Sequence, residues 1–135
     1  MPALMVEFQK FWRENAESYK DMYGYREAVP HLVMVAFLQR VVNGGGRIFR
    51  EMALGSTRLD LCVEFGKFRY AVELKMKRMF SPEKSYPQLL GYLDKLGLAE
   101  GWMAIFDEDK TKPWDEKLFL RDETFNGKTI HVVGL

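Results

Sequence analysis

Several features that would each indicate a class of protein are missing from this sequence. Its one cysteine, Cys62, cannot form an intrachain disulfide, and its two histidines, His31 and His131, lack the spacing of a zinc site. The longest apolar run, residues 31–38, is far below the roughly 20 residues of a membrane-spanning helix. Residues 1–5 do not resemble a basic leader with a cleavage site. We therefore expect a cytoplasmic protein without disulfides or structural zinc.

A large net charge is also missing, but the charges are unevenly distributed. The net charge is +1, yet residues 40–84 contain ten basic and five acidic side chains. A polyanion would therefore bind to this middle segment if it binds at all. A phosphate-binding loop of the Gly-x-x-x-x-Gly-Lys-Ser/Thr type is absent, because the glycines at 44–46 lack the lysine and follow a helical segment. This chain by itself is not an ATPase.

The length of 135 residues and the apolar content predict one folded domain over residues 1–135, in which residues 1–24 form a helical extension or connector. Hydrophobic periodicity predicts helices at 6–22, 31–42 and 86–96, and strands at 48–54, 59–65, 69–76 and 102–106. The second helix is apolar nearly all round, so we expect it to be buried. An irregular, solvent-facing loop is expected at 107–116, followed by a small hairpin around Asn126-Gly127. The fold class is α/β, a mixed sheet flanked by helices.

The hairpin between the second and third predicted strands brings chemical groups together. Glycine at the first position of the two-residue loop Gly66-Lys67 favours a type II′ turn. Opposed positions then sum to 133, so that Asp60 lies across from Glu73 and Arg58 across from Lys75. Period two also places Lys75 on the same face of the sheet as Glu73. Two carboxylates and one ammonium would therefore share one surface.

Directly opposed carboxylates repel each other unless a proton or a cation lies between them. Their hard oxygen ligands suit Mg²⁺ or Mn²⁺, which can activate water and offset charge on a phosphate oxygen. A neighbouring lysine can orient the water, accept its proton or stabilise the transition state. The competing interpretation is a cross-strand salt-bridge cluster of Asp60, Glu73, Lys75 and Arg58 without any metal.

The strings Arg58-Leu59-Asp60-Leu61 and Val72-Glu73-Leu74-Lys75 resemble the signature of the PD-(D/E)XK nuclease superfamily, which has a restriction-endonuclease-like fold. Gln88 and Tyr92 resemble the Gln-x-x-x-Tyr element of its RecB-like members, and they share one helix face. The resemblance extends from Glu27 to the end of the chain. It is strongest to the nuclease-like domains at the C-terminus of prokaryotic AAA-type ATPase-like proteins, although Thr57 stands where a second glycine is common.

The resemblance implies a Mg²⁺- or Mn²⁺-dependent endonuclease that acts on DNA. Asp60, Glu73 and the main-chain carbonyl of Leu74 would hold the metal, Lys75 would act on the water, and Gln88 would orient the site. Four residues are accessory candidates, each with a structural interpretation beside it: Glu27, Glu51, Arg58 and Tyr92. The resemblance also allows an upstream ATPase domain in a longer parent protein, and a homodimer.

A second hypothesis comes from another functional class. The chain would retain the nuclease fold but act as a catalytically weak or inactive binding or regulatory domain of a larger ATPase-containing protein. Its basis is the modest net charge together with three aromatic residues expected to be exposed, Phe11, Trp12 and Trp114.

Overall fold

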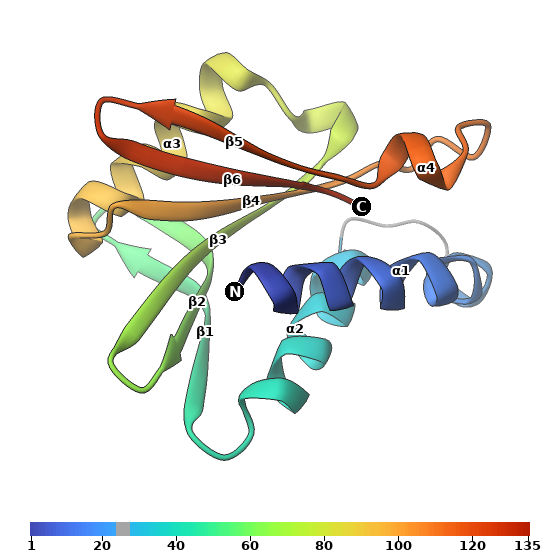
Figure 1. Cartoon of the computed structure of the whole chain (residues 1–135), viewed down its shortest axis with the longest axis horizontal. Coiled ribbons are helices and arrows are strands. Elements are labelled where there is room, and N and C mark those ends of the chain that lie inside the picture. The colour runs from blue at the N-terminus through green and yellow to red at the C-terminus, as the bar shows by residue number, and fades with distance from the viewer. Residues whose placement is uncertain (24–27) are drawn as a thin grey trace.

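The computed structural model describes residues 1–23 and 28–135 and contains one six-stranded sheet with helices on both faces (Figure 1). The elements are α1 (Pro2–Tyr23), α2 (Ala28–Val42), β1 (Gly46–Leu54), β2 (Thr57–Phe65), β3 (Phe68–Met76), the 3₁₀ turn η1 (Lys77–Met79), α3 (Pro82–Leu96), β4 (Glu100–Phe106), α4 (Trp114–Lys117), β5 (Phe119–Phe125) and β6 (Lys128–Gly134). The predicted helices and strands are present in the predicted order, which confirms the mixed α/β class. Within the described residues, no helix is both long and apolar enough to cross a membrane.

The strands lie in the order β1-β2-β3-β4-β6-β5. The first three strands pair antiparallel, as the sequence predicts, whereas β4 pairs parallel with both β3 and β6. Helix α3 provides the crossover that a parallel β3–β4 pair requires. The C-terminal hairpin has the predicted turn, with φ of 47° at Asn126 and 82° at Gly127. It is not a separate unit, because β6 extends the main sheet and β5 forms its edge.

Each face of the sheet covers its own hydrophobic core. Alternate residues of β3 point to opposite faces, so Val72, Leu74 and Met76 pack under α1 and α2, whereas Ala71 packs under α3. Glu73 and Lys75 therefore lie on the α3 face. Strand β4 is buried on both faces over Gly101–Phe106, as expected of a central parallel strand.

Helix α1 packs on the sheet through a row of large side chains at helical spacing, Met5, Phe8 and Trp12, all of which are fully buried. The expectation that Trp12 is exposed is therefore wrong. The amide of Gln9 donates hydrogen bonds to the Phe119 carbonyl at 3.0 Å and to the Gly134 carbonyl at 2.9 Å. These two bonds join α1 to the C-terminal hairpin.

Helix α2 is only half-buried, which corrects the prediction from its composition. Its inner face is fully covered at Met34 and Leu38, but Leu32 is 51% exposed and Ala36 is also exposed. An apolar helix is buried all round only when neighbours cover it on every side. Here α1 and the sheet cover one side among the described residues.

The segment 107–116 is also more ordered than predicted. It begins with Asp107, which is 6% exposed, and it runs into the short helix α4. The carboxylate of Asp107 accepts hydrogen bonds from Lys77 and Lys112, so distant and local charges fix the loop. Sequence patterns of Pro and charge do not reveal such pairing, because one of these partners lies 30 residues away.

Candidate functional site

The turn at Gly66 sets the register of the two strands that carry the candidate site. Gly66 has φ of 60° and Lys67 does not share this positive φ, as a type II′ turn requires. The ladder runs from Phe65↔Phe68 to Leu61↔Val72, and every pair sums to 133. The predicted register is therefore confirmed up to the position next to Asp60 and Glu73.

The regular ladder of backbone hydrogen bonds between β2 and β3 ends at Asp60. From there on, side-chain carboxylates accept the backbone N–H bonds. In a continuous register Leu74 would pair with Leu59, but its N–H instead donates to Asp60 Oδ2 at 2.8 Å. The N–H of Asp60 donates to Glu73 Oε1 at 3.0 Å. The two acids are thus joined across the strands by reciprocal bonds from carboxylate to backbone. They lie close together as predicted, in a local opening of the sheet and not in a regular pair.

Strand β1 is distorted at the same level. Its ladder with β2 passes from Arg50↔Leu61 to Met52↔Leu59 without a recorded pair between Glu51 and Asp60. Glu51 has φ of 48°, in the left-handed region that a non-glycine residue adopts only at a cost of roughly 1–3 kcal/mol. The backbone is therefore irregular on both sides of Asp60. Irregularity of this kind clusters at functional sites.

Glu73 is 2% exposed and faces a second carboxylate. Burial and the neighbouring Asp60 carboxylate raise the pKa of Glu73 to about 8, although the N–H of Asp60 and the charge of Lys75 act in the opposite direction. A proton therefore relieves the repulsion at neutral pH when no cation is present. This is the electrostatic conflict that the sequence predicts.

A chain of hydrogen bonds extends from this pair to α3. Lys75 Nζ lies 3.7 Å from Glu73 Oε2 and donates to Gln88 Oε1 at 3.2 Å. Gln88 Nε2 donates to the Tyr92 hydroxyl at 3.1 Å, and this hydroxyl donates to the Arg58 carbonyl at 2.6 Å. Tyr92 is thus a packed aromatic residue whose polar end reaches the site. Gln88 fixes the amine of Lys75 relative to the carboxylates.

The donor set fits a hard divalent cation. Two carboxylates converge, and Leu74 supplies a third oxygen on the same side, since a strand residue that turns its N–H toward a neighbouring strand turns its C=O the same way. No cluster of three or more His, Cys, Asp or Glu side chains suited to a metal is found in residues 1–23 and 28–135. A site of two carboxylates and one carbonyl needs no third such side chain.

The remaining candidates have different positions. Arg58 is exposed and meets the site through its backbone carbonyl, while the ion pair of Glu73 in the described part of the chain is with Lys75. Glu51 lies beside Asp60 with an exposed side chain. Glu27 lies outside the described residues. Cys62 is buried in the core under α3, and burial raises the pKa of its thiol.

Sequence reasoning missed a second polar group on the α3 face, around Asp107 and Lys117. Both residues fall in or next to the segment predicted to be an irregular loop, yet Lys117 is 4% exposed. A lysine between Glu116 and Leu118 gives no periodic signal of burial. Its environment depends on where α4 packs.

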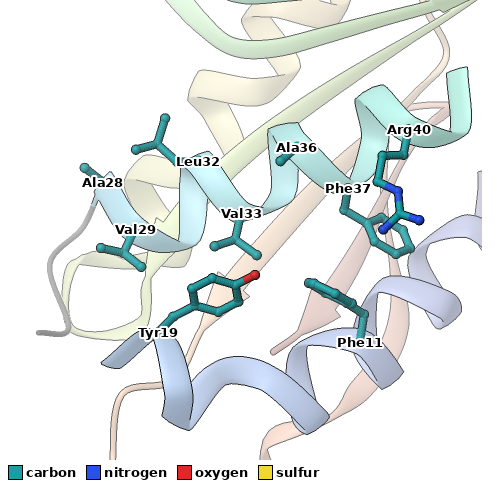
Figure 2. A pocket seen from close by; sticks show the side chains of 9 residues that line it. All are labelled: Phe11, Tyr19, Ala28, Val29, Leu32, Val33, Ala36, Phe37 and Arg40. Carbon is teal, nitrogen blue, oxygen red and sulfur yellow. The ribbon is translucent and has the colours of Figure 1, made fainter. Parts of the chain in front are cut away.

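The other face of the molecule has an apolar cavity of about 600 Å³ between α1 and α2. Figure 2 shows Phe11 and Tyr19 of α1 pointing toward Val33 and Phe37 of α2, with Arg40 at one end. The rings of Phe11 and Phe37 lie 5.3 Å apart. Among the described residues its lining contains no carboxylate, and it lies on the opposite face of the sheet from Glu73.

No family model matches this chain, and no curated protein matches it either.

Proposed function

We propose that this protein is a metal-dependent nuclease that hydrolyses phosphodiester bonds in DNA. The observation that supports it best is the convergence of Asp60, Glu73 and Lys75 at one break in a sheet, with Gln88 and Tyr92 bonded behind them. Two adjacent strands and the helix that follows them supply these groups. A simple surface salt bridge does not require the backbone to open around it.

Asp60, Glu73 and the Leu74 carbonyl would hold Mg²⁺ or Mn²⁺, which would supply Lewis-acid activation of the phosphate and of the attacking water. Lys75 then orients the attacking water and offsets negative charge on the phosphoryl group, held in place by its bond to Gln88. Water oxygen forms a bond to phosphorus while the bond to the leaving oxygen breaks, and the two protons of the water end on solvent and on the leaving group. Glu73 must lose its proton before it can bind a cation.

The test is cleavage of a fluorescent DNA duplex, a single strand of the same sequence and a matching RNA, each with Mg²⁺ or Mn²⁺. Asp60→Asn and Lys75→Ala should each lower the rate by about 10²-fold or more. Glu17→Gln, on the exposed face of α1, makes the same carboxylate-to-amide change elsewhere and should leave the rate unchanged. Equal rates in all four proteins would exclude the nuclease mechanism.

The second candidate function is the inactive binding or regulatory domain of a larger ATPase-containing protein. The open apolar cavity between α1 and α2 favours it, since exposed apolar surface of this kind is typical of interaction sites. The hypothesis is based partly on exposed aromatic residues. Trp12 is buried, which argues against that basis, while Phe11 and Trp114 are half-buried. Titration calorimetry separates the two functions: the nuclease takes up Mn²⁺ saturably and Glu73→Gln abolishes this uptake, whereas the inactive domain shows no such uptake.

A further inference from the structure

A small cavity with several charged residues in its lining lies on the α3 face at the carboxyl ends of β3 and β4. It has a volume of about 130 Å³. Its charged lining consists of three cations, Lys77, Lys117 and Arg121, and two acids, Asp107 and Glu116. None of these residues belongs to the proposed hydrolytic group.

The cavity adjoins the candidate site. Ile105 lines it and is the register partner of Lys75 on β3. Neighbouring strands lie about 4.8 Å apart, so the cavity begins one strand away from the lysine that contacts Glu73. On the side of α3, the Tyr86 hydroxyl contacts the Arg121 guanidinium at 3.5 Å. A polymer bound across the carboxylate pair would therefore pass this cavity next.

Lys117 is the unusual residue of the cavity. Its side chain is 4% exposed, and its ammonium lies 4.8 Å from the centre of the Trp114 ring. The hydrogen bonds and ion pairs recorded for the described residues give this ammonium no acceptor and no carboxylate. Burying a cation without an anion is costly, and a ring face offsets only part of that cost. Because Lys117 lines the cavity, an anion bound there would lie next to its ammonium.

The other charged groups around the cavity do not supply an anion for Lys117. Asp107 already accepts from Lys77 at 3.1 Å and from Lys112 at 2.9 Å, so two ammonium groups share one carboxylate. Arg121 pairs with Glu123 at 3.3 Å in an exposed, weak contact and lies over the Phe119 ring.

With the neighbours Lys112, Asp109 and Glu123 included, the charged groups in and beside the cavity are four cations and four carboxylates. The total charge is balanced, and Lys117 differs from the other cations because no carboxylate of the described residues pairs with its ammonium.

We propose that this cavity binds a phosphate group of the nucleic-acid substrate, adjacent to the phosphate that is cleaved at Asp60 and Glu73. Lys117 is its main contact, and Lys77 and Arg121 line the opening. The identity of the ligand as nucleic acid rests on the proposed function. The observation that no carboxylate pairs with the Lys117 ammonium is independent of the proposed function.

The experiment measures binding without cleavage. A short fluorescent DNA duplex is titrated in EDTA against the wild-type protein and Lys117→Met, at several salt concentrations. Lys117→Met should weaken binding by about tenfold and reduce the slope of log K against log salt by about 1. The matched control Lys110→Met removes an exposed lysine of the preceding loop and should change affinity much less. Equal affinity of wild type and Lys117→Met overturns the proposal.

Thermal unfolding of the free proteins supplies a second readout. Because Lys117→Met removes a buried cation that has no anion, it should raise Tm in the absence of ligand. Inorganic phosphate should raise the Tm of the wild type and not that of the variant. A lower Tm with unchanged DNA affinity would make Lys117 a structural residue and overturn the proposal. Stabilisation by phosphate with unchanged DNA affinity would overturn the assignment to substrate.

Arg121→Gln provides a check on the opposite wall if Lys117→Met does not fold, and it should also weaken DNA binding. The outcomes distinguish the phosphate subsite from the nuclease mechanism. If Lys117→Met weakens DNA binding while Asp60→Asn leaves cleavage unchanged, the subsite stands and the nuclease mechanism fails. If Asp60→Asn abolishes cleavage while both cavity variants bind DNA as the wild type does, the nuclease stands and the subsite fails.

Discussion

Glu73 and Asp107 make an instructive pair. Both are nearly buried carboxylates, 2% and 6% exposed, and each has a lysine beside it; Glu73 lies in β3, and Asp107 directly follows the neighbouring strand β4. Yet the pKa of Glu73 is about 8 and that of Asp107 is about 2. Two carboxylates with similarly small exposed fractions therefore differ in protonation at neutral pH.

The difference lies in the partners that each carboxylate has. Burial raises the pKa of both groups, but hydrogen bonds from Lys112, the Asp109 N–H and Lys77 outweigh it at Asp107. Glu73 has one backbone donor and a more distant ammonium, and it faces the like charge of Asp60. Asp107 is satisfied by the protein alone. Glu73 is satisfied only by a proton or by a cation from outside.

The pH dependence of stability should show this contrast most strongly. Unfolded Glu73 loses its proton near pH 4.3, whereas folded Glu73 keeps it up to about pH 8. Between these values the folded state binds one more proton, so the stability of the metal-free protein falls as pH rises, by up to about 1.4 kcal/mol per pH unit. Urea denaturation in EDTA at several pH values measures it. Glu73→Gln should flatten this part of the curve, and an unchanged slope would contradict the raised pKa.

Asp107→Asn should produce the next largest effect. It leaves Lys77 and Lys112 without their carboxylate and should lower the free energy of unfolding by about 2 kcal/mol at pH 8. Glu73→Gln, in the same metal-free buffer, should raise it, because an amide needs no proton to relieve the repulsion from Asp60. Chemical denaturation of both variants tests the contrast. Destabilisation of equal size in both would show that the two carboxylates play the same role.

The lowered pKa of Asp107 also predicts how the stability of the protein changes in acid. Its folded pKa of about 2 is below the unfolded value near 3.9, so its stabilising contribution is present above pH 3.9 and is lost as pH falls through 2. The acid limb of the stability curve should therefore be shallower in Asp107→Asn than in the wild type. Circular dichroism at pH 2–5 measures this limb, with Glu17→Gln as the control.

Tyr92→Phe should have a smaller effect of about 1 kcal/mol, since it removes the hydroxyl that bonds to the Arg58 carbonyl. The loss also frees Gln88, so under the proposed nuclease function the rate of DNA cleavage should fall more than stability alone explains. Comparison of kcat with KM for this variant at a temperature well below its Tm separates the two effects. A variant that unfolds earlier but cleaves at the wild-type kcat would assign Tyr92 to packing only.

Lys77→Gln should have the smallest effect, about 0.5 kcal/mol, because its side chain is 52% exposed and Lys112 still holds Asp107. Lys112→Gln, whose lysine is less exposed, should cost more. Thermal denaturation of both variants shows which lysine contributes more to stability. A larger loss for Lys77→Gln than for Lys112→Gln would show that η1, which carries Lys77, fixes Asp107 more strongly than the loop that carries Lys112.

Much of the site could be predicted because its determinants are local. The glycine at position 66 fixes the turn, the turn fixes the register, and the two-residue period of β3 places Glu73 and Lys75 on one face. The spacing of Gln88 and Tyr92 places both on one face of α3. None of these relations needs knowledge of the rest of the chain.

The burial of α2 could not be predicted in the same way. Its apolar composition indicates where it can be buried, but Leu32 is exposed because no described element lies over that side. The order of the loop after β4 could not be predicted for a related reason, since one partner that orders Asp107 comes from η1. Contacts between distant segments leave no periodic pattern in a sequence.

The sequence by itself determined the order of the elements, the hairpin register and the facing pair of acids, because these follow from turn geometry and alternation over a few residues. Only the tertiary structure decided that the ladder opens at Asp60, that Glu73 holds a proton to about pH 8 and that Lys117 is buried beside the site. The reason is physical: burial and electric fields depend on side chains brought together from far along the chain, as Tyr92 and Arg58 are, 34 residues apart.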